Sequence, residues 1–163
     1  MFKFGAREAA ASGIMAALVC VATMLIQIPI PATEGFFNIG DAMVMVASIT
    51  FGPIVGGLAG GVGSALADAL GGWYTWVPFT LVIKGAEGIV AGIIVGNKRT
   101  SRRVLAAWVL GGLIMVSGYF IVQVFLYGLG AALVEGPFNL VQMTVAGVVG
   151  IPISLALKSR LRI

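Results

Sequence analysis

Long, continuous runs of apolar residues restrict the fold of this chain more than any other feature. Of 163 residues, 60% are hydrophobic and only 10% are charged, whereas a soluble domain carries about 25% charged residues. Such a chain belongs in a lipid bilayer, where only helices and closed β-barrels pair every backbone N–H and C=O group. Barrel strands alternate in polarity and these runs do not, so the sequence predicts an all-α integral membrane protein.

Turn signals rich in glycine and proline divide the apolar sequence into six segments, which we expect to form a single transmembrane domain over residues 1–163. The second segment is short for a span, which needs about 20 residues. We still expect a break between the second and third segments, because Pro53 follows Gly52 and interrupts a helix. The expected helices cover about 8–28, 39–52, 53–71, 77–95, 104–127 and 137–157.

The basic residues predict the orientation of this bundle. With six spans, every lysine and arginine except Lys84 falls on one face, whereas the opposite loops hold Glu34 and Glu135 and no basic residue. Of these two, Glu135 is expected to be a solvated loop charge. Lysine and arginine collect on the cytoplasmic side of membranes, so both termini are expected in the cytoplasm. The net charge of +4 is then explained by topology, and no nucleic-acid partner is expected. The basic residues on this face are Lys3, Arg7, Lys98, Arg99, Arg102, Arg103, Lys158, Arg160 and Arg162.

The sequence offers few groups for catalysis. It contains no histidine, its carboxylates are scattered, and its one cysteine, Cys20, lies in an apolar run. We therefore expect no enzyme activity, no metal and no cofactor. The glycine-rich stretches GGLAGGVGS and GPIVGG lack the Lys-Ser/Thr pair of a phosphate-binding loop. Transport driven by ATP would need a separate ATPase subunit.

Most polar side chains of the apolar segments fall in the half of the bundle that lies away from the basic residues. Polar groups in a bilayer are costly and usually face the interior or a wet cavity. A pore would need a polar path through the whole bundle, so this asymmetry favours a pocket open to the outside. The polar and aromatic residues of this half are Asn38, Asp41, Asp68, Trp73, Tyr74, Trp76, Lys84, Glu87, Tyr119, Gln123, Asn139 and Gln142.

Each of these residues also has a structural interpretation. Asn38 and Asp41 could cap the second helix, and the aromatic residues of GGWYTW could form an interfacial belt. Lys84 and Glu87 are spaced i,i+3 and could form an ion pair, with Asp68 as a further partner of the lysine. A buried ion pair is often no more stable than hydrophobic residues in its place. Charges beside aromatic rings therefore favour a flat polar ligand, and substituting Lys84 or Glu87 is expected to weaken ligand binding far more than folding.

Small residues recur every four positions on two helices. The third segment carries Gly56, Gly60 and Ser64, a pattern that permits close helix packing inside the bundle. The first segment carries a similar row, which suits either internal packing or an external helical partner. That row is Ala9, Gly13 and Ala17.

Two stretches carry a resemblance to a known family, GFFNIGDAMVMVASITFGPIVGGLAGGVGSALADALGG and WYTWVPFTLVIKGAEGIVAG. On these stretches, and over nearly the whole chain, the sequence resembles the substrate-binding S component of energy-coupling factor (ECF) vitamin transporters, and the riboflavin-type group most closely. The resemblance implies a multi-pass protein of the prokaryotic cytoplasmic membrane that binds a vitamin outside. It also implies docking on a membrane scaffold subunit with two ATPase subunits, followed by toppling that moves the pocket inward.

The resemblance also implies a pocket built from the loop between the first two helices and the outer parts of the last three. The loops 29–37 and 128–136 would act as gates, and the row from Ala9 to Ala17 would be a glycine variant of the scaffold-docking alanines. Together with the residues chosen above, the expected substrate-binding set is Glu34, Phe36, Asn38, Asp68, Trp73, Trp76, Lys84, Glu87, Gln123, Asn139 and Gln142.

Several ligands fit this set. The aromatic residues suit riboflavin, or the smaller rings of hydroxymethylpyrimidine, thiamine and pyridoxine. No negative charge on the ligand is required, because Glu87 and Asp68 offset Lys84. Three alternatives to a binding subunit stay open: a self-contained secondary transporter or channel, a purely structural membrane subunit, and an intramembrane enzyme.

Overall fold

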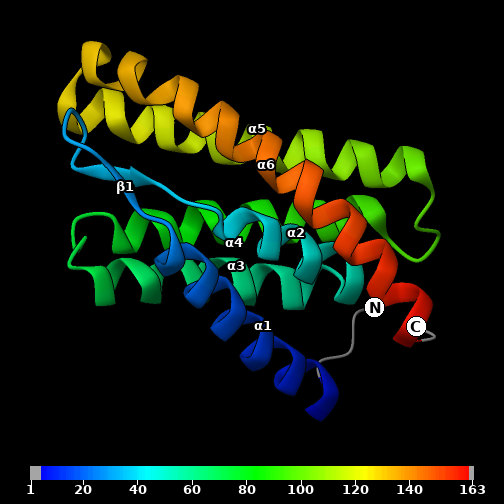
Figure 1. The fold of residues 1–163 in the computed structure, drawn as a ribbon. Helices are drawn as coiled ribbons and strands as arrows, with labels where there is room; N and C mark the ends of the chain where they lie inside the picture. Colours follow the sequence, from blue (N-terminus) through cyan, green and yellow to red (C-terminus); the bar gives the residue numbers. More distant parts are fainter. Residues whose placement is uncertain (1–4, 162–163) are drawn as a thin grey trace.

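The computed structural model describes residues 5–161, which form a bundle of six helices with one short β-hairpin (Figure 1). Lys3 and Arg162, expected on the cytoplasmic face, lie outside these residues. Five of the helices are long and apolar enough to cross a membrane, in agreement with the predicted helical membrane fold. The elements are α1 (Ala6–Leu25), β1 (Ile28–Ile30), β2 (Gly35–Phe37), α2 (Gly40–Phe51), α3 (Pro53–Gly71), α4 (Val77–Val95), α5 (Ser101–Tyr127) and α6 (Leu129–Leu161).

The short helix α2 follows a hairpin that takes up part of the depth of the bundle. Its 12 residues measure about 18 Å, whereas the hydrocarbon core of a bilayer is about 30 Å thick. The hairpin pairs β1 and β2 in antiparallel register, with Ile28 opposite Phe37 and Ile30 opposite Gly35. The segment expected at 39–52 is thus the half-length helix α2, which follows the hairpin, and its first turn is buried inside the bundle.

Helices α3 and α4 pack with their backbones in close approach. A Cβ atom on Gly88 of α4 would meet the carbonyl of Gly56 on α3, and one on Gly56 would meet the carbonyl of Gly88. The small-residue pattern of α3 thus serves packing inside the bundle. The row on α1 differs, because Ala9, Gly13 and Ala17 are all exposed.

Two buried apolar clusters occupy the interior of the bundle. They lie between the α4–α5 link and the buried charged residues Asp41, Lys84 and Glu87. One joins α1, α2 and α3, and the other joins α2, α4, α5 and α6. The start of α1, the link between α4 and α5 and the end of α6 lie at the same end of the bundle (Figure 1). The first cluster is Met15, Val19, Val44, Val46, Ala47, Val55 and Ala59, and the second is Met45, Ile49, Ala91, Val95, Val104, Ala107 and Ala146.

The expected gate loop at 128–136 is wrong, because most of it is helix. Only Gly128, with φ of 85°, separates α5 from α6. The glycine and proline residues of this stretch indicated a loop, but Leu129–Leu161 forms one helix that continues through Pro137. Neighbouring helices make proline tolerable inside membrane helices. A helix that begins at Leu129 places Glu135 one and a half turns in, at 4% exposure, so the expectation of a solvated loop charge is also wrong.

Candidate functional site

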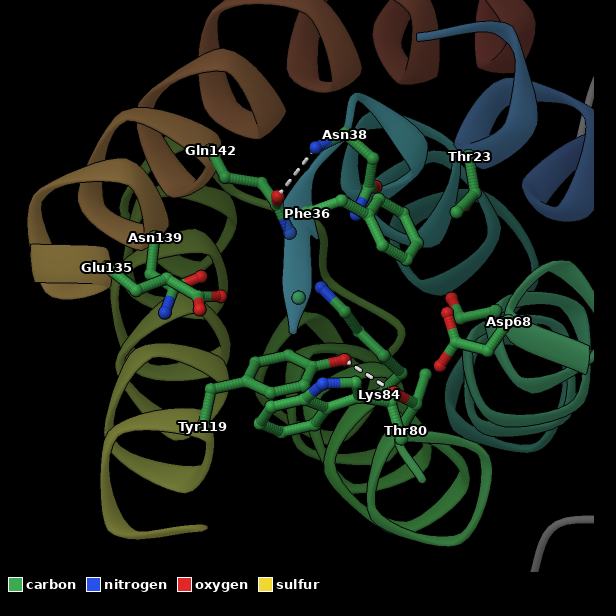
Figure 2. Close-up of a pocket in the computed structure, with 13 residues that line it drawn as sticks. Thr23, Phe36, Asn38, Asp68, Thr80, Lys84, Tyr119, Glu135, Asn139 and Gln142 are labelled. Atoms are coloured by element: carbon green, nitrogen blue, oxygen red, sulfur yellow. Dashed lines mark hydrogen bonds between the residues drawn. The ribbon is translucent and has the colours of Figure 1, made fainter. Parts of the chain in front are cut away.

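A polar cavity lies among the hairpin and helices α1, α3, α4, α5 and α6 (Figure 2). It includes seven of the predicted binding residues, which the fold brings together from distant parts of the sequence. Its free volume, about 30 Å³ for the centres of water molecules, is small, so a vitamin requires lining side chains or the hairpin to move. The lining residues are Thr23, Gly35, Phe36, Asn38, Ser64, Asp68, Trp76, Thr80, Lys84, Tyr119, Glu135, Asn139 and Gln142.

A buried charge network lies at the base of this cavity. Lys84, 2% exposed, forms an ion pair with Asp41 of α2, and its Nζ lies 3.6 Å from Glu87 Oε2. Gln142 of α6 donates from Nε2 to Asp41 Oδ2 at 2.5 Å and accepts at Oε1 from the backbone N–H of Asn38 at 3.0 Å. One connected set of polar groups thus ties α4, α2 and α6 together.

The pairing differs from the sequence-based expectation. The predicted pair of Lys84 and Glu87 exists, but Asp41 is the closer partner of the lysine, and Asp68 is not an ion-pair partner among the described residues. Asn38 lies one position before the N-cap residue Ile39, and its Oδ1 accepts from the N–H of Gly40, the first residue of α2, at 2.9 Å. Asp41 does not cap α2. Its carboxylate is used for the charge network instead.

Aromatic rings form one wall of the cavity. Trp76 lies with its ring centroid 5.7 Å from that of Tyr119 and 6.1 Å from that of Tyr127. The Tyr119 hydroxyl and Thr80 Oγ1 form a hydrogen bond of 3.0 Å, and Lys84 Nζ lies 5.4 Å from the Tyr119 ring centroid. Figure 2 shows Tyr119 and Lys84 reaching toward the centre of the cavity from neighbouring helices. Such a wall suits a flat ring with polar groups at one edge.

The turn of the hairpin is fastened over the cavity from two sides. Glu135 of α6 accepts a hydrogen bond from the Thr33 hydroxyl. Trp76 donates from Nε1 to the carbonyl oxygens of Glu34 at 2.9 Å and Thr33 at 3.3 Å. Glu34 has φ of 48°, a left-handed conformation that is costly for a residue other than glycine. Opening the hairpin must break these bonds, which we name the Thr33 latch.

Four predicted residues do not line the cavity. Glu34 and Trp73 line a neighbouring depression of about 440 Å³, which shares Gly35 and Trp76 with the cavity. Glu87 and Gln123 are buried behind the cavity wall, and their side-chain amide and carboxylate atoms have no hydrogen-bond partner among the described residues. Glu87 is connected to the cavity through its ion contact with Lys84, which lines the cavity.

Sequence reasoning missed several lining residues, some of which left a signal. Ser64 precedes Asp68 by four positions and Thr80 precedes Lys84 by four, so each shares a helix face with a predicted residue. Thr23, near the end of α1, gave no such signal. Its proximity to the cavity results from the packing of α1 against the start of α2, where a Cβ on Gly40 would meet the Thr23 side chain.

A bundle of apolar helices around a polar cavity is the architecture of a multi-pass membrane protein. The sequence model of one family, the S component of the ECF-type riboflavin transporter, matches residues 3–159 of this chain. The chain therefore belongs to this family, as the resemblance predicted. Its members are transporter subunits of the cell membrane rather than enzymes.

Two relatives and one solved structure illustrate the similarity. An "uncharacterized protein in gap 3'region" of Pyrococcus woesei is 47% identical over 143 residues, which cover 88% of this chain and 96% of that protein. The thiamine precursor transporter HmpT of Lactococcus lactis subsp. cremoris (strain MG1363) is 32% identical over 133 residues, which cover 81% and 76%. A structure of the S component of a bacterial ECF transporter has the same fold, with a TM-score of 0.73, 22% identity and coverage of 96% and 98%.

Proposed function

We propose that this chain is the substrate-binding membrane subunit of an ECF-type importer, which captures a water-soluble vitamin or vitamin precursor outside. The observation that carries this proposal is the buried network of Lys84, Asp41 and Gln142 beside the ring of Trp76. Charged and amide groups at one edge with aromatic faces at the other suit a flat heterocycle. Delivery inward would require a membrane scaffold subunit and two ATPase subunits on separate chains.

A small pyrimidine, of the hydroxymethylpyrimidine type, is the ligand class we favour over riboflavin. The cavity is small, and its lysine is offset by carboxylates, so neither a bulky tricyclic ring nor a negative charge is required. The relative HmpT is named as a thiamine precursor transporter, which agrees with a small ring. Lys84 and Gln142 would bind the ring nitrogens and substituents, and Phe36 and Trp76 would cover its faces.

The apolar clusters below the network favour a binding subunit over a channel or a self-contained transporter. Val44, Met45 and Ala91 are 0% exposed and fill the interior next to the charged residues. A solute could not pass them without a large rearrangement of the bundle. The exposed row of Ala9, Gly13 and Ala17 offers a flat helix surface on which we propose that the scaffold subunit docks.

Tryptophan fluorescence tests the proposed function. Purified, ligand-stripped protein in detergent is titrated with hydroxymethylpyrimidine, thiamine, pyridoxine and riboflavin, and saturable quenching at sub-micromolar concentration by one of them is expected. Trp76→Phe should remove most of the signal, because Trp76 lines the cavity. Trp108→Phe is the matched control, because the Trp108 indole donates to the Met143 carbonyl outside the cavity at 2.7 Å. Flat titrations of folded protein across the panel would refute binding of these vitamins.

The Thr33 latch should control the rate at which a bound vitamin leaves. Thr33→Val keeps the shape of the side chain but removes its hydrogen bond to Glu135, so the hairpin should open more easily. A hydrogen bond to a charged group is worth about 1.5–3 kcal/mol, and we expect dissociation to accelerate about tenfold or more, measured by stopped-flow displacement. Thr144→Val, which loses a bond to the Leu140 carbonyl on an exposed face, should leave the rate unchanged. An unchanged rate in Thr33→Val would exclude the latch.

A further inference from the structure

A further pocket lies at the opposite end of the bundle, where the basic residues collect. It is formed by the start of α1, the junction of α2 and α3, and the link between α4 and α5. Its volume of about 110 Å³ for the centres of water molecules exceeds that of the proposed vitamin cavity. Its lining residues are Arg7, Glu8, Ala11, Thr50, Phe51, Val55 and Arg99.

Arg99 is held at this pocket in an unusual manner. Its φ of 36° is left-handed, which is costly for a residue other than glycine. Its Nη2 donates to the carbonyl of Thr50 at 2.6 Å, whereas its Nη1 is buried and has no hydrogen-bond partner among the described residues. The bond to Thr50 fixes the guanidinium group, and the remaining N–H groups are left to bind something else.

The charge of the pocket favours an anion. Arg7 and Arg99 contribute two guanidinium groups, and neither forms an ion pair with a described carboxylate. Glu8 is the one acidic residue in the lining, and its Oε2 accepts a hydrogen bond from the Gly5 N–H at 3.0 Å. The planar donors of a guanidinium group match the oxygen atoms of a phosphate.

The apolar side of the pocket indicates that the phosphate belongs to a lipid. Ala11, Phe51 and Val55 lie in the lining beside the arginines. Ile14 and Leu18 follow Ala11 by three and seven positions, on one face of α1, and are 63% and 46% exposed. This face could contact an acyl chain, which a free phosphate ion lacks. Basic pockets between membrane helices are known to bind anionic headgroups.

We infer that the pocket formed by Arg7, Arg99 and Thr50 binds the phosphate headgroup of an anionic phospholipid. This site is separate from the proposed vitamin cavity and does not depend on the identity of the vitamin. A lipid seated there would bridge α1 and the α4–α5 link, because Arg7 lies on α1 and Arg99 on the link.

Native mass spectrometry of the purified protein with added phosphatidylglycerol or phosphatidylcholine tests the inference. One tightly retained phosphatidylglycerol is expected, with weaker retention of phosphatidylcholine. Arg7→Gln and Arg99→Gln should each weaken phosphatidylglycerol retention about tenfold. Arg102→Gln is the matched control, because it removes the same charge from an exposed site at the start of α5 outside the pocket lining.

Arg7→Gln keeps the test decisive even if Arg99→Gln, which loses the bond to Thr50, does not fold. Equal retention of the two lipids would overturn the inference, as would a loss in the Arg7 variant no larger than in Arg102→Gln. Displacement of phosphatidylglycerol by millimolar inorganic phosphate would assign the pocket to free phosphate. If the arginine variants retain lipid unchanged but capture the scaffold subunit more weakly, the arginines bind a carboxylate of that protein instead of a lipid. Either result would also overturn the lipid site.

Discussion

Lys84→Met is expected to abolish vitamin binding and to lower the free energy of unfolding by about 3–5 kcal/mol. The substitution removes the cation between Asp41 and Glu87, both 1% exposed, and leaves two buried acidic groups without their counter-charge. It also removes an ammonium group from the cavity lining. Fluorescence titration measures the first effect, and thermal or denaturant unfolding in detergent measures the second.

A double variant separates the two effects. Lys84→Met combined with Asp41→Asn removes both members of the closest pair, so part of the stability should return. Binding should not return, because the cavity still lacks its ammonium group. Full stability of Lys84→Met alone would contradict the buried ion pair, and recovery of binding in the double variant would exclude a contact between Lys84 and the ligand.

This expectation differs from the one based on sequence alone, in which substituting Lys84 affects binding far more than folding. The difference results from Asp41, which the sequence suggested only as a possible cap of the second helix. Its partner Lys84 lies 43 positions away, and no local pattern predicts a contact of that range. A lysine in an apolar run, by contrast, is conspicuous because charge in a bilayer is costly.

The fold shows the same division between local and long-range information. Pro53 and the Gly72–Trp76 turn mark both ends of α3 and the start of α4 in the sequence, because proline and glycine determine local backbone conformation. The break before Pro53 also made the second helix short in the sequence, whereas the early start of α6 left no such mark. The hairpin is held by Glu135 and Trp76, which come from other parts of the chain, and the continuation of α6 through Pro137 depends on neighbouring helices.

Gly88→Leu is expected to separate α3 from α4 and to prevent recovery of folded protein. A Cβ on Gly88 would meet the backbone carbonyl of Gly56 and the backbone nitrogen of Gly57. Backbone atoms in a helix cannot turn aside as a flexible side chain can, so the whole helix must shift. Overpacking of a core usually costs about 1–3 kcal/mol, and a leucine between two backbones should exceed that range. The measurement is the yield of monodisperse protein in size-exclusion chromatography, with unfolding of any soluble fraction.

Gly85→Ala is the matched control on the same helix. A Cβ on Gly85 would lie 3.7 Å from the Gly57 carbonyl oxygen, an ordinary contact, and alanine favours a helix over glycine by up to about 1 kcal/mol. This variant should fold normally and bind its vitamin, because Lys84 keeps its position relative to the cavity. A normal yield of Gly88→Leu would contradict the close approach of α3 and α4. Equal damage from both substitutions would show that the glycines of α4 supply backbone freedom rather than space.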